Sequence, residues 1–259
     1  MDRIDRVETY EARVPLLHPL IVGSARISHR TYSIVRITTS DGITGVGYCY
    51  SRGLPISKII EAVMSPHLIQ ETAESADEIR GKLLAANWQS SEHGTLTSGL
   101  SAIDIALNDI MAKRSGKSVA QFLGSDLQEI PVYSVIGYDN RNDEAGLEEE
   151  IDHALSRGIK SFKIVVGAKS PERDAHRIKT LRDRVGADAL IAVDAFRTFG
   201  DLEKAKSRVN LFKEYGISFV EDAFLESQGK LSIALREQAG VPISFGESLA
   251  SASMAQQVI

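Results

Sequence analysis

The chain has 259 residues, of which 43% are hydrophobic and 25% charged, and its net charge at pH 7 is −5. This composition is typical of a globular protein with a well-formed core, and the negative charge gives no reason to expect nucleic acid or an anionic membrane as a partner. No apolar run approaches the roughly 18 residues of a membrane span, and the single cysteine, Cys49, cannot form an internal disulfide. Since the first residues also lack a signal-peptide pattern, we expect a cytoplasmic protein.

The first 50 residues predict β-structure. A first strand is expected over residues 4–14. A hairpin is expected over residues 32–48, because Asp41 and Gly42 supply the positive φ that a tight turn requires. These strands would form one sheet.

Residues 17–30 lie between the expected strands and show no hydrophobic period. They predict a loop that is longer than a compact domain usually keeps without a use. Its polar residues His18, Arg26 and His29 are therefore candidate substrate contacts, with exposure to solvent as the alternative.

Residues 56–125 predict helices. In the clearest one, Leu100, Ile103, Leu107 and Ile110 share one face, and the helix is expected to end near Gly116. A sheet followed by helices without alternation indicates an α+β domain. We therefore expect two domains, an α+β domain at 1–128 and a second domain at 129–259.

In the second domain, short apolar runs alternate with helical patterns that stop at glycine. Four runs cover residues 161–166, 189–193, 217–220 and 242–245, and a first alternating unit begins near 131. Glycine just past a helix end adopts the left-handed conformation cheaply, so it is a stop signal. The alternation predicts a parallel α/β barrel, whose carboxyl strand ends gather the chemistry on one face.

Each of the four runs carries or immediately precedes a charged residue, namely Lys163, Asp194, Glu221 and Glu247. Three carboxylates at successive strand ends would repel one another unless a cation lies among them. An all-carboxylate site suits Mg²⁺, which prefers hard oxygen ligands. The alternative is that each acid caps a helix or faces solvent, but three in successive units favour the metal.

With these residues the whole chain resembles the first two-thirds of an enolase-superfamily protein of the mandelate racemase / muconate lactonizing enzyme group, with the mandelate racemase subgroup favoured. The resemblance rests on the N-terminal sheet and on Ala102-Ile-Asp-Ile-Ala-Leu-Asn-Asp, Phe162-Lys-Ile-Val-Val-Gly, Val193-Asp194, Val220-Glu221-Asp222 and Gly246-Glu247-Ser248. It implies a capping domain over a modified TIM-type barrel, with Asp194, Glu221 and Glu247 as ligands of one Mg²⁺. It also implies that Lys163 contacts a substrate carboxylate while a base removes the α-proton to give an enediolate.

Two positions depart from the family pattern. The second lysine of the family's Lys-x-Lys, often a base on one face of the substrate, is replaced by Val165, and Lys169 in the following loop is the nearest substitute. The family's Asp-x-Asn reads Asp194-Ala-Phe196, with Arg197 next to it as a candidate substrate contact.

The segment 131–259 supplies about five of the eight barrel units. The absent part would carry the Asp and His pair that the family uses as the opposite base, so no general base is recognisable. We expect the chain to be an incomplete view of the functional protein, which is further expected to be a homo-oligomer.

The leading hypothesis is a Mg²⁺-dependent enzyme acting on a small-molecule carboxylate, with an acid-sugar dehydratase as the favoured activity. Elimination can use one base, whereas racemisation ordinarily needs groups on both faces, and Val165 removes one of them. The alternatives are a racemase or epimerase, a truncated or inactive relative, and an aldolase with Lys163 as a Schiff-base lysine. Three neighbouring acids argue against the aldolase, because they would raise a lysine pKa that needs lowering.

Overall fold

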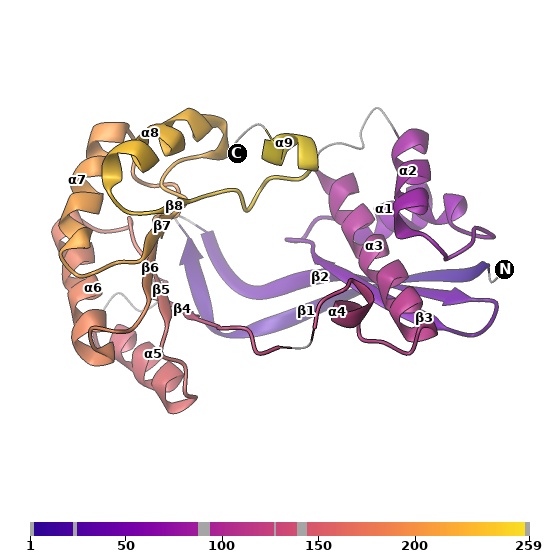
Figure 1. Cartoon of the computed structure of the whole chain (residues 1–259), viewed down its shortest axis with the longest axis horizontal. Coiled ribbons are helices and arrows are strands. Elements are labelled where there is room, and N and C mark those ends of the chain that lie inside the picture. Colours follow the sequence, from indigo (N-terminus) through magenta and orange to yellow (C-terminus); the bar gives the residue numbers. More distant parts are fainter. Residues whose placement is uncertain (1–2, 23–24, 88–93, 127, 139–143, 257–259) are drawn as a thin grey trace. The chain divides into compact units, whose positions relative to one another are not determined.

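The computed structural model describes residues 3–22, 25–87, 94–126, 128–138 and 144–256. By its backbone contacts the chain divides into two units, the first built mainly from Ser28–Glu129 and the second mainly from Ile130–Leu249. Figure 1 shows the helices and strands of each unit. Across the described ranges, every helix is too short or too polar to cross a membrane.

The N-terminal part of the chain forms a three-stranded sheet in the order β1-β2-β3, with β1 at Ile4–Val22, β2 at Ala25–Thr39 and β3 at Thr44–Tyr50. Most of this sheet belongs to the first unit, while His18–Ile27 is counted with the second. β2 and β3 are antiparallel, with Thr38 opposite Thr44. In the turn between them, Gly42 has a φ of 83°, a conformation that costs glycine little. The predicted hairpin is therefore confirmed.

The prediction of a loop over residues 17–30 is wrong. The long strands β1 and β2 run through this stretch and lie side by side as hydrogen-bonded neighbours (Figure 1). None of the side chains described between 17 and 30 is buried. Hydrophobic alternation appears only where one face of a strand is buried, so a paired ribbon without a buried face lacks the pattern on which the prediction depended.

Helices follow the sheet, as predicted for residues 56–125. They are α1 (Ile56–Ile59), the π-helix η1 (Ile60–Met64), the 3-10 helix η2 (Ser65–His67), α2 (Ala76–Ala86), α3 (Thr95–Arg114) and α4 (Val119–Phe122). The predicted face of α3 is confirmed, because Leu100, Ile103, Leu107 and Ile110 are all buried. They join β-sheet residues such as Val35 and Ile37 in the core of this unit.

The backbone of α3 lies directly against β3. A Cβ atom at Gly45 would collide with the carbonyl oxygen of Ala106, and one at Gly47 would collide with that of Ala102. The two glycines of Gly45-Val-Gly, which have no side chain, therefore allow the strand and the helix to approach closely.

The second unit alternates strands and helices. Its strands are β4 (Ser134–Ile136), β5 (Phe162–Val165), β6 (Ile191–Asp194), β7 (Phe219–Glu221) and β8 (Ile243–Ser244). Its helices are α5 (Glu144–Ser156), α6 (Pro171–Val185), α7 (Leu202–Lys213), the 3-10 helix η3 (Glu226–Gln228), α8 (Gly229–Ala239) and α9 (Ala252–Gln256).

The five strands form one parallel sheet in chain order, β4-β5-β6-β7-β8. This is the part of the predicted barrel that the structure shows, and closure into eight strands stays a prediction. The predicted stops are also present: α8 ends at Gly240, which has the left-handed φ of 63°.

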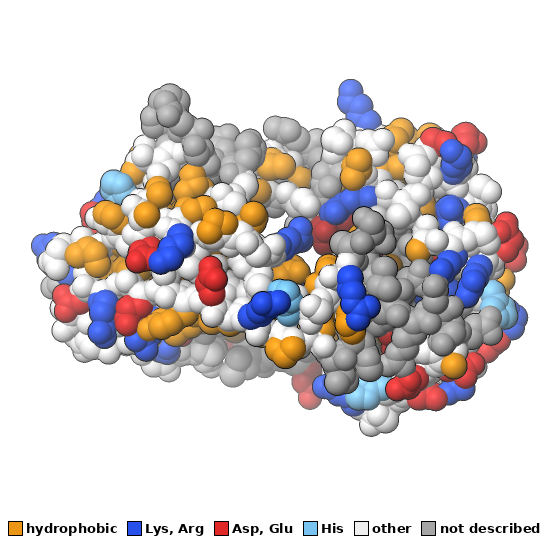
Figure 2. Space-filling model, turned by 180° about the vertical axis from the view of Figure 1, so that it is seen from behind, with side chains coloured by type: hydrophobic (Ala, Val, Ile, Leu, Met, Phe, Trp, Pro, Cys, Tyr) orange, Lys and Arg blue, Asp and Glu red, His pale blue; other side chains and the backbone are white. Residues whose placement is uncertain are grey.

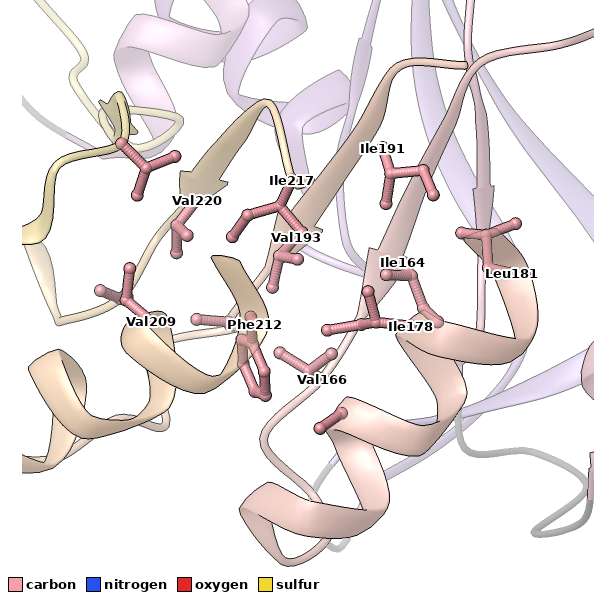
Figure 3. Packing of buried hydrophobic residues seen from close by; sticks show 14 of the residues in the cluster. Ile164, Val166, Ile178, Leu181, Ile191, Val193, Val209, Phe212, Ile217 and Val220 are labelled. Atoms are coloured by element: carbon pink, nitrogen blue, oxygen red, sulfur yellow. The ribbon is translucent and has the colours of Figure 1, made fainter. Parts of the chain in front are cut away.

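The core of this unit lies between the sheet and its helices. Figure 3 shows Ile164 and Val193 from the strands packed against Ile178 of α6 and Phe212 of α7, and all four are fully buried. Because β6 is buried along its whole length, it has no polar alternation, as expected for a central strand of a parallel sheet.

The surface carries charges of both signs. On the face drawn in Figure 2, acidic and basic side chains are interspersed, without one continuous basic patch.

The contact of β3 with α3 gives a stability prediction. Gly47→Ala should lower the free energy of unfolding by about 3 kcal/mol, the upper part of the overpacking range, because the obstructing atoms are helix backbone. Gly81→Ala in α2 is the matched control, since its added Cβ meets nothing within 4 Å. It should stabilise by about 0.5–1 kcal/mol. Urea unfolding measures both changes, and a neutral Gly47→Ala would contradict the close contact.

Candidate active site

Lys163 lies between two carboxylates at the carboxyl ends of adjacent strands. It is on β5, while Asp194 and Glu221 end β6 and β7 and are register partners. The Lys163 Nζ atom donates to Glu221 Oε2 at 2.7 Å and lies 3.4 Å from Asp194 Oδ2. Lys163 and Asp194 are each only 8% exposed. The sequence predicted that charged residues of successive strands gather at one edge of the sheet. The structure brings three of them, Lys163, Asp194 and Glu221, together.

Burial and charge act against each other in this group. Burial tends to lower the pKa of Lys163, but the hydrogen bond to Glu221 and the charges of Asp194 and Glu221 together raise that pKa above its usual value. Burial raises the pKa of Asp194, although the Phe196 N–H and Lys163 oppose this shift. The lysine is thus held in its charged form by its two acidic neighbours.

Glu247 has a different cation as its partner. The Arg197 Nη2 atom lies 2.7 Å from Glu247 Oε1 and 3.1 Å from Asp222 Oδ2, and it also donates to the Ser248 hydroxyl at 3.3 Å. The Glu247 side chain is 48% exposed, whereas that of Asp222 is 7% exposed. Arg197 therefore bridges one exposed acid and one buried acid.

The loops that carry these groups have an unusual backbone. Phe196, Arg197 and Asp222 have φ values of 47°, 60° and 48°. Side chains other than glycine seldom adopt this left-handed region, and such residues tend to cluster at functional sites. The Arg197 N–H donates to the Asp222 carbonyl oxygen at 2.6 Å, so the two loops are fastened to each other.

The three acids expected to bind a metal are thus in two cation-bound groups. Within the described part of the chain, no three His, Cys, Asp or Glu side chains are grouped closely enough to hold one ion. Their chemistry nevertheless suits Mg²⁺, since all three offer hard oxygen donors. The assignment of Asp194, Glu221 and Glu247 as metal ligands stays a prediction.

A buried ionic network that the sequence analysis missed supports the loops after β4 and β5. Asp174 of α6 is 0% exposed and accepts from the Gly167 N–H at 2.8 Å. Arg177 contacts Asp174 at 3.3 Å and donates to the carbonyl oxygens of Val165 at 3.0 Å and Gly137 at 2.6 Å. The Arg208 Nη1 atom of α7 lies 3.6 Å from Asp174.

Burial raises the pKa of the Asp174 carboxyl, while the Gly167 N–H and the two arginines oppose this shift. The sequence did contain a signal: Asp174 is four residues before Ile178 and seven before Leu181, so a charge lies on the apolar face of the helix.

The candidate substrate contacts of the N-terminal ribbon lie on β1 and β2. The side chain of His18 lies outside the part that the structure describes, and Arg26 is exposed. The His29 Nδ1 atom is 3.1 Å from Arg13 Nη2 and 3.2 Å from Ser28 Oγ. Their role as substrate contacts stays a prediction.

Two family models match the chain. The model of the mandelate racemase / muconate lactonizing enzyme N-terminal domain matches residues 5–124, and the model of the enolase C-terminal domain-like group matches residues 146–259. The first match lies mainly in the first structural unit and the second mainly in the second, while residues 125–145 lie in neither.

Individual relatives differ in their named activities. The chain is 32% identical to an arabinonate dehydratase of Saccharolobus solfataricus over 80% of its own length, and it spans 56% of that protein. It is 28% identical to a chloromuconate cycloisomerase of Cupriavidus necator, with 98% of the chain and 68% of that protein aligned. An L-talarate dehydratase structure from a Polaromonas species, complexed with Mg and L-glucarate, superposes with a TM-score of 0.92 at 26% identity, covering 100% of this chain and 71% of the other.

The Asp174 network gives a second stability prediction. Arg177→Met leaves a buried carboxylate and two backbone oxygens without this donor, so the free energy of unfolding should fall by about 3–5 kcal/mol. Lys179→Met in the same helix is the control, because the Lys179–Asp183 pair is exposed on both sides and should contribute little. Equal urea midpoints for the two variants would show that the network does not stabilise the fold.

Proposed function

Because the chain belongs to the mandelate racemase / muconate lactonizing enzyme family of the enolase superfamily, we propose that it is part of a Mg²⁺-dependent enzyme that removes the proton alpha to a carboxylate. In this proposal residues 1–128 form the capping domain, and residues 129–259 form about five units of a modified (β/α)₈ barrel. The substrate is a small hydroxy-carboxylic acid, and the enzyme is a lyase or an isomerase.

The observation that carries this proposal is the position of Lys163 on β5 between Asp194 and Glu221, the last residues of the two following strands. Removing three charges from water is costly and stabilises a fold only weakly. Such groups at the carboxyl ends of parallel strands are therefore better explained by chemistry than by stability.

Asp194, Glu221 and Glu247 would hold the metal in this proposal. Their donor set contains only carboxylate oxygens, which suits Mg²⁺ better than Zn²⁺. When bound, the ion would offset the negative charge that develops on the substrate carboxylate as the α-proton leaves.

Lys163 would donate a hydrogen bond to the substrate carboxylate. Its acidic neighbours keep it protonated, so it suits a donor of hydrogen bonds and a fixed positive charge. A Schiff-base lysine needs the opposite, a neutral amine, and this argues against the aldolase alternative.

Dehydration is the reaction that we favour. Val165 stands in place of the family's second lysine and cannot accept a proton. In β-elimination one base takes the α-proton and returns it to the departing hydroxyl group, which leaves as water. Racemisation would need a second proton carrier on the opposite face of the substrate. The similarity to arabinonate dehydratase and L-talarate dehydratase supports an acid sugar as substrate.

The metal site gives a binding prediction. Asp194→Asn and Glu221→Gln should each weaken Mg²⁺ binding by at least about tenfold, equivalent to 1.4 kcal/mol, because each removes a charged oxygen ligand. Calorimetry on the full-length protein measures this affinity. Glu203→Gln is the matched control, since Glu203 is exposed on α7 and pairs with Lys206; the proposal is wrong if all three variants bind equally well.

The reaction type gives a further prediction. With a panel of acid sugars in D₂O, NMR should show loss of water and formation of a 2-keto-3-deoxy product, with deuterium entering from one face only. Inversion of configuration at the α-carbon at an appreciable rate would instead assign a racemase or epimerase. A ring-forming product from an unsaturated diacid would assign a cycloisomerase.

A further inference from the structure

We propose that Arg197 is an internal competitor of the divalent cation for Glu247, and that it thereby sets the metal affinity of the site. This inference rests on the proposed metal site. It concerns a residue that the family pattern does not explain, the arginine directly after Phe196.

The first argument is the geometry of the pair. The contact between Arg197 Nη2 and Glu247 Oε1 is 2.7 Å long, the distance of a strong charge-assisted hydrogen bond. A carboxylate oxygen in this contact has to give it up, at least in part, before it can coordinate a metal ion. The free energy of the contact is therefore subtracted from that of metal binding.

The second argument is that the arginine is held in place by its backbone. Arg197 has a φ of 60°, and its N–H donates to Asp222 across the two loops. Its side chain is only 22% exposed. Because the backbone fixes where the side chain starts and the side chain is already mostly buried, part of the conformational entropy of holding the guanidinium at Glu247 has been lost on folding.

The third argument is that Arg197 keeps a partner when Glu247 leaves. Asp222 lies 3.1 Å from the same nitrogen and is buried, so the guanidinium would not be left without a counter-ion. Glu247 is the more exposed of the two acids and directly follows Gly246, whose φ is 121°. When a metal ion replaces Arg197 as the partner of Glu247, the Glu247 side chain would therefore move, and Arg197 would stay paired with Asp222.

The fourth argument is the charge balance. Asp194, Glu221, Asp222 and Glu247 are four carboxylates, and Lys163 and Arg197 are the two cations paired with them. When all six are ionised, the group retains two negative charges, which one divalent cation would neutralise. A metal ion can thus enter without either protein cation being expelled, provided that Glu247 changes its partner.

The experiment compares Mg²⁺ and Mn²⁺ affinities by calorimetry and by Mn²⁺ electron paramagnetic resonance on the full chain, without substrate. Arg197→Gln should bind both ions about tenfold more tightly than the wild type. Arg197→Lys keeps the charge but loses the rigid guanidinium that holds Nη2 against both acids, and it should bind several-fold more tightly. Arg184→Gln is the control, because Arg184 of α6 forms an exposed pair with Asp152 of α5. The substitution removes the same charge and should leave the affinity unchanged.

Equal affinities of wild type and Arg197→Gln would overturn the competition and leave the metal site standing. An equal rise in Arg184→Gln would overturn it as well, because net charge would then be the cause. Absence of cation binding in both wild type and Arg197→Gln would remove the metal site and this inference together. If circular dichroism shows that Arg197→Gln is unfolded, Arg197→Lys decides, and an unchanged affinity in that variant overturns the proposal.

Discussion

Carboxylates at the ends of adjacent parallel strands repel one another, and the carboxyl edge of the second unit depends on how that repulsion is balanced. Lys163 balances Asp194 and Glu221, and Arg197 balances Asp222 and Glu247. Each cation comes from a different strand or loop than the acids it contacts. The charges therefore fasten together the ends of strands that are far apart in sequence, and they leave a group that is still negative.

The parallel sheet could be predicted because its local signals agree with one another. Buried strands such as β6 are apolar up to the charged residue at their end, and glycines such as Gly240 mark where helices end. The ribbon of β1 and β2 could not be predicted in the same way. Its stability comes from backbone pairing between two strands. None of the described side chains from 17 to 30 is buried, so the sequence there shows no hydrophobic period.

For the candidate site, the sequence predicted the nearness of Lys163, Asp194 and Glu221, because parallel strands place successive carboxyl ends at one edge. It could not predict which cation each acid would contact. The pairing of Arg197 with Glu247 depends on a left-handed backbone at Arg197 and Asp222. Neither residue is a glycine, so the sequence does not indicate that conformation. Asp174 was missed for a different reason: acidic residues of a helix usually face solvent, whereas this one is buried among arginines.

The seam between β3 and α3 limits how the first unit can change its sequence. Most of a protein core consists of side chains that can exchange volume with their neighbours, so a larger residue at one position can be offset by a smaller one nearby. At Gly45 and Gly47 the strand meets the carbonyl groups of Ala106 and Ala102, which are main chain. No neighbouring substitution can shrink a carbonyl group. A larger residue at Gly45 or Gly47 therefore cannot be offset by a smaller one nearby, and it would have to shift the whole helix.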